Sequence, residues 1–279
     1  MAARRPAKAT GWRLFVRTTL ARVYPRVIGG NREKAWVFFD IFLPLLALSA
    51  YVFVYRGLRT PEEFVGFVIL GGAMSAFWLN VMWAMSSQLY WEKETGNLPL
   101  FIMAPGPLAA VLLGMALGGI LNASIRAIVI LAAGIWLFDA PFQVADGPLL
   151  AVVFVLTLTA LYGMGMMFAS VFLLFGREAW HLVNLAQEPV FLLSGTYFPI
   201  RYFHGWIAAG ASLIPLTLGL DAIRQLVFES GAALGFLSVG VEVLALLALT
   251  VIFLLGAGLM LAHMERLAIA EGKLTAGGA

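Results

Sequence analysis

Long apolar runs are the feature that most restricts the fold of this 279-residue chain. A helix needs roughly 20 mostly apolar residues to cross a bilayer, and runs near that length recur between residues 35 and 262. The chain is 62% hydrophobic and 12% charged, whereas soluble domains contain about 45–50% apolar residues. It has no cysteine, so disulfides, thiolate chemistry and cysteine-based metal sites are excluded. The sequence predicts an all-α integral membrane protein.

Six transmembrane helices are predicted from these runs, and the fifth of them is barely long enough to cross. A second short apolar stretch follows the fifth run. Irregular backbone at membrane depth is tolerated only where protein or a cavity surrounds it, so we predict a re-entrant helical hairpin on the outer side over about residues 195–228. The six predicted spans cover approximately residues 35–55, 64–89, 107–137, 149–175, 178–194 and 236–262.

The basic residues predict the orientation of the chain. Six spans place both termini on one side, and the segments on that side hold 13 of the 18 Lys and Arg. The positive-inside rule then puts both termini in the cytoplasm. We expect a multi-pass protein in the inner membrane of a prokaryote. Three parts are expected: a cytoplasmic segment 1–34, a transmembrane domain 35–262 and a cytoplasmic tail 263–279. The first apolar run begins only near Ala35, so no cleavable signal peptide is expected.

Nine of the 18 basic residues precede residue 35, and this clustering explains the basic pI without a nucleic-acid partner. In the same segment, apolar residues recur at helical spacing from Trp12 to Val27, with Arg13, Arg17 and Arg22 at the edges of the apolar face. This pattern predicts an amphipathic helix in the membrane interface, whose arginines reach lipid phosphates. The alternative is a solvated helix that packs on the rest of the protein.

The segment WEKETGNL, which follows the second run, combines three charges with apolar residues and a glycine. On the predicted topology it lies in the cytoplasm. Apolar residues rimmed by charge are typical of a docking surface, and a short helix stopped by Gly96 would present them to a soluble partner. The alternative interpretation is a solvated turn that Glu92 and Glu94 keep in water.

Three motifs together resemble the type-2 ABC exporter permeases: WEKETGNL, LLSGTYFPI at Leu192–Ile200, and PLTLGLDAIRQLVF at Pro215–Phe228. They come in the family's order and at similar distances. The resemblance implies a cytoplasmic coupling helix over about residues 91–104 and a gate at the outer mouth. The coupling residues would be Trp91, Glu92, Lys93, Glu94, Gly96, Asn97 and Leu98, and the gate residues Ser194, Gly195, Tyr197, Phe198 and Pro199.

The resemblance also implies a function: the chain would be the permease subunit of an ATP-driven exporter. Its partners would be two copies of a separate ATP-binding subunit, a second permease in a homodimer or heterodimer, and membrane lipids. ATP and Mg would bind to the partner, because we find no GxxxxGK[ST] phosphate loop here; this chain would then be no enzyme and hold no cofactor. The expected cargo is an amphiphile, either a drug-like molecule or a lipid. Alternatives are export of a polysaccharide or lipid-linked glycan and, with less support, an ion-coupled secondary transporter or a membrane-embedded enzyme.

Charged residues inside the predicted spans are costly and usually paired or facing water. Arg126, Glu188 and Glu242 lie deep by residue count, whereas Asp40 lies near the end of its span, where an acid costs little. Arg126 is predicted to pair with Glu242, in preference to Glu188. The pair would either pin two helices together or line the translocation pathway; no catalytic or metal-binding residue is predicted.

Overall fold

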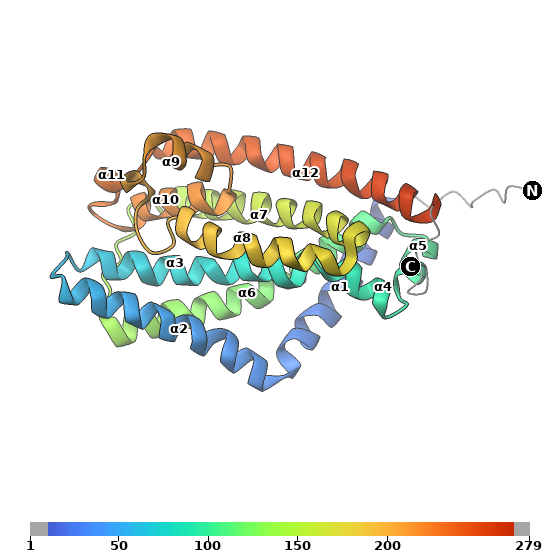
Figure 1. The fold of residues 1–279 in the computed structure, drawn as a ribbon, viewed down its shortest axis with the longest axis horizontal. Helices are drawn as coiled ribbons and strands as arrows, with labels where there is room; N and C mark the ends of the chain where they lie inside the picture. The colour runs from blue at the N-terminus through green and yellow to red at the C-terminus, as the bar shows by residue number, and fades with distance from the viewer. Residues whose placement is uncertain (1–10, 271–279) are drawn as a thin grey trace, which may run out of the picture.

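The computed structural model describes residues 11–270, which form helices joined by turns, with no strand among them (Figure 1). In the first half, the helices are α1 (Trp12–Arg32), α2 (Lys34–Gly57), α3 (Glu63–Leu79), the π-helix η1 (Asn80–Met85), α4 (Gln88–Glu94), α5 (Leu98–Met103) and α6 (Leu108–Phe138). In the second half, they are α7 (Gly147–Phe175), η2 (Gly176–Glu178), α8 (Ala179–Leu193), η3 (Ile200–Tyr202), α9 (Gly205–Ala211), α10 (Pro215–Val227), α11 (Gly231–Leu234) and α12 (Val239–Ala270).

Five helical segments in the described part of the chain are long and apolar enough to cross a membrane. They confirm the predicted multi-pass, all-helical membrane fold, with a longer second segment than expected. The five segments are Val37–Gly57, Glu63–Glu94, Leu108–Phe138, Gly147–Phe172 and Val239–Met264.

The predicted fifth span is shorter than a full crossing. Helix α8 has 15 residues, which is about 22 Å at 1.5 Å per residue, against a hydrocarbon core of about 30 Å. Further along the chain, α9 and α10 form a pair bent by 106°, the geometry of a broken span or a re-entrant loop. The number of spans is therefore five, or six if the bent pair is counted as one.

Turn residues explain where the long helices begin. Pro107 has an extended backbone and precedes α6. The Asp146 carboxylate accepts a hydrogen bond of 2.9 Å from the Leu149 amide and so caps α7, which has a proline in its first turn. Between α3 and α4 the chain runs through η1 and the two turn residues Ser86 and Ser87, and Glu63–Glu94 forms one apolar segment of 32 residues. The predicted coupling segment is therefore an extension of the second span.

The long helices lie side by side, and the connections gather at two ends (Figure 1). Helices α4 and α5 lie at the same end as the C-terminal part of α12, whereas α9, α10 and α11 lie at the other (Figure 1). Helix α3 lies at the centre of the bundle. In the segment Glu63–Glu94, which contains α3, 89% of the most apolar stretch is buried, compared with 11% in the segment Val37–Gly57 of α2. The exposed surface of α2 is thus left for lipid or another protein chain.

Helix α1 packs closely against α6. A side chain at Gly114 would meet the Thr19 carbonyl, and one at Gly118 would meet Arg26. Small residues allow this close approach of two helix backbones. The GxxxG pattern of α6 therefore serves contact within the chain, and it fixes α1 beside α4 and α5.

Candidate functional site

The predicted coupling segment consists of two short helices, α4 and α5, joined by a tight turn. Gly96 has a φ of +75°, a left-handed conformation that glycine adopts without strain. The Thr95 amide donates to the Trp91 carbonyl at 2.9 Å and the Asn97 amide to the Glu92 carbonyl at 2.8 Å. These bonds satisfy the last carbonyls of α4, and α5 can then start at Leu98.

Glu92 points inward and ties α4 to α1. Its side chain is buried and forms an ion pair with Arg22, and it accepts a hydrogen bond of 3.0 Å from Gln88. The Arg22 guanidinium also lies 4.6 Å from the centre of the Phe101 ring in α5, a cation–π contact. Arg22 therefore joins α1, α4 and α5 through contacts within the chain.

An apolar tip remains exposed at this end of the molecule. Trp91 is 51% exposed, Leu100 59% and Met103 73%, and Glu94 and Asn97 beside them are also exposed. Leu98 is fully buried beneath them. Two of the seven predicted coupling residues, Glu92 and Leu98, thus support the turn from inside, and Lys93 is half-buried. The other four face outward: Trp91, Glu94, Gly96 and Asn97. We call Trp91, Leu100 and Met103 the apolar tip.

Arg126 forms an ion pair with Asp40 of α2: its Nη2 lies 2.8 Å from Oδ2 of the carboxylate. The predicted pairing with Glu242 or Glu188 is therefore wrong. Residue counting estimates depth along a helix but not the direction around its axis, and the face of α6 that carries Arg126 meets α2. The pair is partly exposed, with 19% of the Arg126 side chain and 36% of the Asp40 side chain accessible in the single chain.

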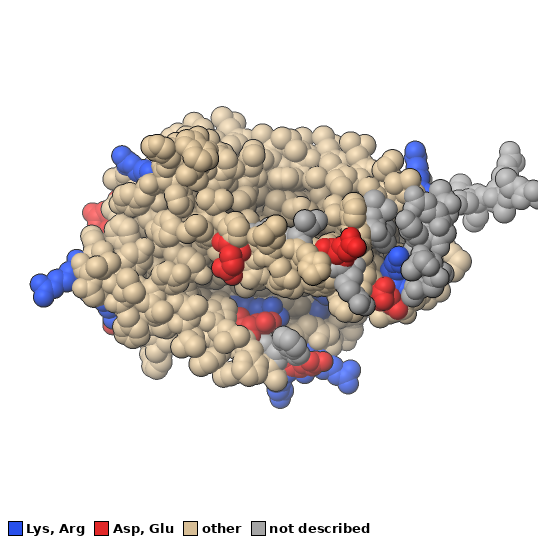
Figure 2. Space-filling model, in the orientation of Figure 1, with Lys and Arg blue, Asp and Glu red and all other residues tan. Residues whose placement is uncertain are grey.

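The Asp40–Arg126 pair lies in a hollow made of two adjoining cavities of about 270 and 490 Å³. Both cavities are lined by Asp40, Pro44 and Leu79. Figure 2 shows acidic and basic atoms together in the hollow between the α2 and α8 regions. We call the space the α2–α8 hollow. It extends from Arg26 and Asn122 to Tyr197 of the predicted gate.

The predicted gate is held from behind by Arg224 of α10. This fully buried guanidinium donates to the carbonyls of Gly195 at 2.5 Å, Thr196 at 2.9 Å and Phe67 of α3 at 2.8 Å. It also lies over the Phe67 ring, 5.1 Å from its centre. The second and third sequence motifs therefore contact each other directly, because the arginine of one binds the backbone of the other.

The gate also contacts α2. Tyr55 donates to the Tyr197 carbonyl at 2.9 Å, and the Tyr51 and Tyr197 rings stack with centres 4.0 Å apart. Burial, together with Tyr51 and the nearby charge of Glu188, raises the pKa of Tyr197 to about 12, so its phenol is neutral at pH 7. Behind it, the hydroxyls of Ser194 and Thr196 lie 2.9 Å apart and are buried. Glu188 is exposed on α8, on the same side as this gate residue.

Glu242 belongs to a polar cluster between α10 and α12. Its Oε2 accepts a hydrogen bond of 3.1 Å from Gln225, which also donates to the Leu237 carbonyl at 2.8 Å. Asp221 accepts from the Phe236 amide at 2.8 Å. Glu242 is fully buried, and it fixes the last long helix to the bent pair.

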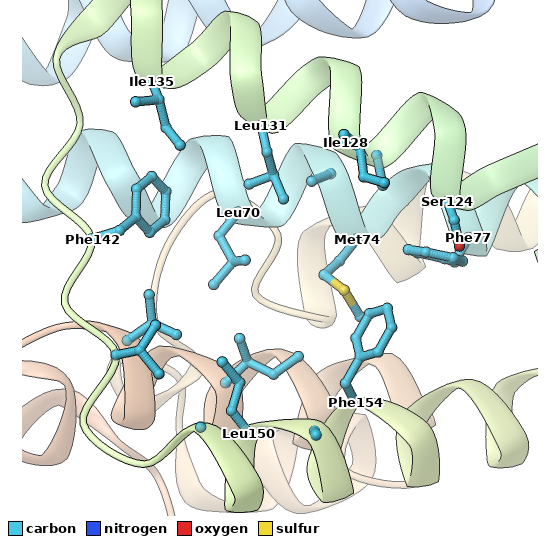
Figure 3. A pocket seen from close by; sticks show the side chains of 17 residues that line it. Leu70, Met74, Phe77, Ser124, Ile128, Leu131, Ile135, Phe142, Leu150 and Phe154 are labelled. Atoms are coloured by element: carbon cyan, nitrogen blue, oxygen red, sulfur yellow. The ribbon is translucent and has the colours of Figure 1, made fainter.

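A further cavity of about 560 Å³ lies between α3, α6, α7 and α10 (Figure 3). Apolar side chains such as Leu70, Met74 and Phe154 point into it, and Ser124 contributes the polar group (Figure 3). None of the predicted site residues lines it. It is an apolar space of a different character from the charged α2–α8 hollow.

Three important residues make contacts that the sequence interpretation did not predict: Arg22, Asp40 and Arg224. Arg224 offered a signal, since it is an arginine within the motif PLTLGLDAIRQLVF, and a cation among apolar residues needs partners. Asp40 offered none, because it lies near the end of a predicted span, where an acid costs little. The helical pattern placed Arg22 at the edge of an apolar face and gave no sign of its partner Glu92.

Comparisons with known proteins identify similar sequences. The family model described as "ABC-2 type transporter" matches residues 30–228. The inner membrane transport permease YadH of Escherichia coli K12 is 24% identical over 204 residues, which are 70% of this chain and 75% of that protein. The probable multidrug ABC transporter permease YbhR of the same strain is 24% identical over 156 residues, 55% of this chain and 41% of that protein.

Proposed function

The chain belongs to the ABC-2 type transporter family, and from this premise we propose that it is the permease of an exporter driven through α4 and α5. Membership makes the chain a multi-pass permease subunit of an ABC transporter in the inner membrane and implies association with an ATP-binding ABC subunit. We propose a docking surface for that subunit, a translocation pathway through the membrane and a class of cargo.

The apolar tip is the proposed docking surface. The observation that supports this proposal is the way in which α4 and α5 are attached to α1 and α3. Three exposed apolar side chains lie on two short helices at one end of the molecule, beside Glu94 and Asn97. The Arg22–Glu92 pair fixes these helices to α1, and η1 with the short turn at Ser86 and Ser87 connects them to the core helix α3 within the single segment Glu63–Glu94. Movement imposed on the tip would therefore be transmitted directly to the centre of the bundle.

The α2–α8 hollow is the proposed translocation pathway, completed by a second permease. Ionised side chains in a membrane are expensive when they face lipid, yet the Asp40–Arg126 pair is partly exposed in the single chain. A second copy, or a related permease, packed against α2 would enclose the pair in a space between the two subunits. Two ATP-binding subunits would then serve the two apolar tips.

The proposed gate closes the outer end of this pathway. Tyr197 lines the hollow and is held by Tyr51, Tyr55 and, through the adjacent carbonyls, Arg224. With α4 and α5 in the cytoplasm, the bent α9–α10 pair would be re-entrant from the outside. An amphiphilic drug-like molecule or lipid is the cargo that best fits a hollow with both charged and apolar walls, and one relative is named a probable multidrug permease.

Co-purification tests the docking surface. The double variant Trp91→Ala/Leu100→Ala is compared with wild type and with Leu58→Ala, an exposed leucine between α2 and α3. Membranes of the native organism are solubilised, the tagged permease is isolated, and co-purified ATPase is measured by ATP hydrolysis and mass spectrometry. We expect wild type and the Leu58 variant to retain an ATP-binding subunit and the tip variant to lose most of it. Equal recovery in all three would reject the tip as the docking surface.

A further inference from the structure

The two parts of the α2–α8 hollow differ in chemistry. The cavity on the gate side is lined mainly by apolar groups, including Phe39, Leu43 and Phe191. The cavity on the α4 side is lined by Arg26, Arg126, Asn80 and Asn122, with Trp83. The space is therefore amphipathic along its length, with polar groups toward the docking end.

The charges that line the hollow do not balance. Two guanidinium groups, those of Arg26 and Arg126, share one carboxylate, that of Asp40. Asp40 pairs with Arg126, whereas among the described residues the acceptors of Arg26 are neutral: the Gln88 side chain at 2.8 Å and the Ala84 carbonyl at 3.1 Å. The lining side chains thus carry a net charge of one positive unit.

Both arginines also keep an unused donor. The Nε atoms of Arg26 and Arg126 are buried and have no hydrogen-bond partner among the described residues. A buried donor without a partner is costly, and a partly buried cation without a counter-ion adds to this cost. Burial lowers the pKa of Arg26, and the neighbouring charges of Arg22 and Arg126 act in the same direction. Both guanidiniums line the same cavity, so their like charges repel each other there, and an anion between them would relieve this repulsion.

We propose that the hollow binds an anionic amphiphile, with its phosphate or carboxylate head group at Arg26 and Arg126 and its chain along the apolar walls beside Phe39, Leu43 and Phe191. Arginine suits this role because its planar fork of donors matches the oxygens of phosphate and carboxylate. The inference rests on the proposed function, since it specifies the cargo of the same pathway. On the proposed orientation, the head group enters from the cytoplasmic leaflet.

Binding is tested with two fluorescent probes that share one long alkyl chain, an alkyl phosphate and the uncharged alcohol. The full-length permease is placed in nanodiscs of zwitterionic lipid without nucleotide, and the preference for the phosphate over the alcohol is measured. We expect wild type to prefer the phosphate, and Arg126→Gln to reduce that preference on the order of tenfold, the value of one charge-assisted hydrogen bond. An equal affinity of wild type for both probes would overturn the inference.

Asp40→Asn distinguishes an anion site from a purely structural ion pair. If the pair only holds α2 against α6, Asp40→Asn and Arg126→Gln break the same contact and should change probe binding in the same direction. An anion site predicts opposite directions, because removal of the competing carboxylate raises the preference for the phosphate. The double variant Asp40→Asn/Arg126→Gln replaces the ion pair by two uncharged amide side chains. It leaves no unpaired charge and so controls for misfolding of the single variants. It should fold, and its preference for the phosphate should lie below that of Asp40→Asn.

Inorganic phosphate as a competitor separates an amphiphile from a free anion. We expect it to displace the alkyl phosphate only at concentrations far above that of the probe, because it cannot use the apolar walls. Displacement at equal concentration would overturn the amphiphile assignment. The assay needs no ATPase, so failure of the docking proposal leaves the probe preference intact, and absence of the preference leaves ATPase co-purification intact.

Discussion

At the scale of single residues, Arg224 connects more of the molecule than any residue singled out in advance. One buried guanidinium binds carbonyl groups of α3 and of the gate turn. Hydrogen bonds to a charged donor contribute about 1.5–3 kcal/mol each, and carbonyls left unpaired in this interior would add a penalty. The position of the gate therefore depends on a side chain outside the gate motif.

Replacing Arg224 by leucine should lower the free energy of unfolding by about 3 kcal/mol or more, because three carbonyl acceptors lose their donor. The free energy of unfolding of Arg224→Lys should lie between those of wild type and Arg224→Leu. A lysine ammonium keeps the charge but lacks the planar fork of donors that reaches the carbonyls of both α3 and the gate turn. Thermal unfolding of the purified protein in one detergent measures the effect. The matched control is Arg59→Leu, which changes an exposed arginine at the same end of the bundle. Equal melting temperatures for Arg224→Leu and Arg59→Leu would contradict this role.

The sequence predicted correctly that two deep charged residues would need polar partners, but it did not predict which partners they have. The cost of a deep charge singled out Arg126 and Glu242, and both have polar partners in the structure. The partners were not predictable, because a residue's direction around its helix depends on how the helices pack. Arg126 faces α2 and Asp40, whereas Glu242 faces α10 and Gln225.

At the scale of elements, Gly71 determines how closely the gate turn approaches α3. A side-chain carbon at this position would lie 1.8 Å from the Thr196 carbonyl oxygen. Because the obstacle is backbone, the turn itself would have to move. Gly71→Ala is expected to destabilise the protein by about 1–3 kcal/mol.

Gly258→Ala is the control for this change, since an added carbon there meets nothing within 4 Å. It should be neutral or slightly stabilising, because alanine is the better residue in a helix by about 0.5–1 kcal/mol. Thermal unfolding of the two variants under identical conditions compares them. Two glycines that tolerate alanine equally would show that the gate turn does not depend on contact with α3.

The Arg22–Glu92 pair is the second element-scale prediction. Removing one partner leaves a largely buried charge alone, which is strongly destabilising, whereas replacing both by apolar groups is often nearly neutral. Arg22→Met and Glu92→Leu should each reduce stability and ATPase co-purification, and the double variant should recover much of both. A double-mutant cycle by thermal unfolding measures the coupling, expected at about 0.5–3 kcal/mol. A double variant as impaired as the sum of the single variants would show that the two residues act separately.

Helix positions were predictable because a helix that crosses the bilayer needs an apolar run of about 20 residues. The four runs near residues 35–55, 107–137, 149–175 and 236–262 all correspond to long helices. The second run, 64–89, ended too early in the prediction, because charges at Glu92 and Glu94 mimic the end of a span although the helix continues to Glu94. The short α8 and the bent α9–α10 pair were hardest to place, since neither has the length that identifies a span.

At the scale of the whole molecule, the two ends are predicted to lie on opposite sides of the membrane, with α4 and α5 in the cytoplasm. The natural absence of cysteine makes this testable with single substitutions. Ala145, between α6 and α7, and Thr95, between α4 and α5, are both exposed. A membrane-impermeant maleimide should label Ala145→Cys in intact cells and Thr95→Cys only after permeabilisation. The reverse pattern would invert the proposed orientation.

The three sequence motifs predicted the family but not their mutual contacts. WEKETGNL lies on the extension of α3, and the same helix receives the Arg224 bond that holds LLSGTYFPI. All three motifs therefore meet one central helix, which runs from the apolar tip to the gate. A motif search sees their order along the chain, whereas the shared helix appears only when the chain is folded.

The most direct test of the account is photo-crosslinking from the apolar tip. Trp91 is replaced by benzoylphenylalanine in the native organism, cells are irradiated, and the adduct is identified by mass spectrometry, with the same substitution at Leu58 as control. If an ATPase docks at α4 and α5, the Trp91 probe captures a protein carrying a GxxxxGK[ST] phosphate loop and the Leu58 probe does not. Adducts from Trp91 that contain only lipid or proteins without that loop would contradict docking of an ATPase at α4 and α5.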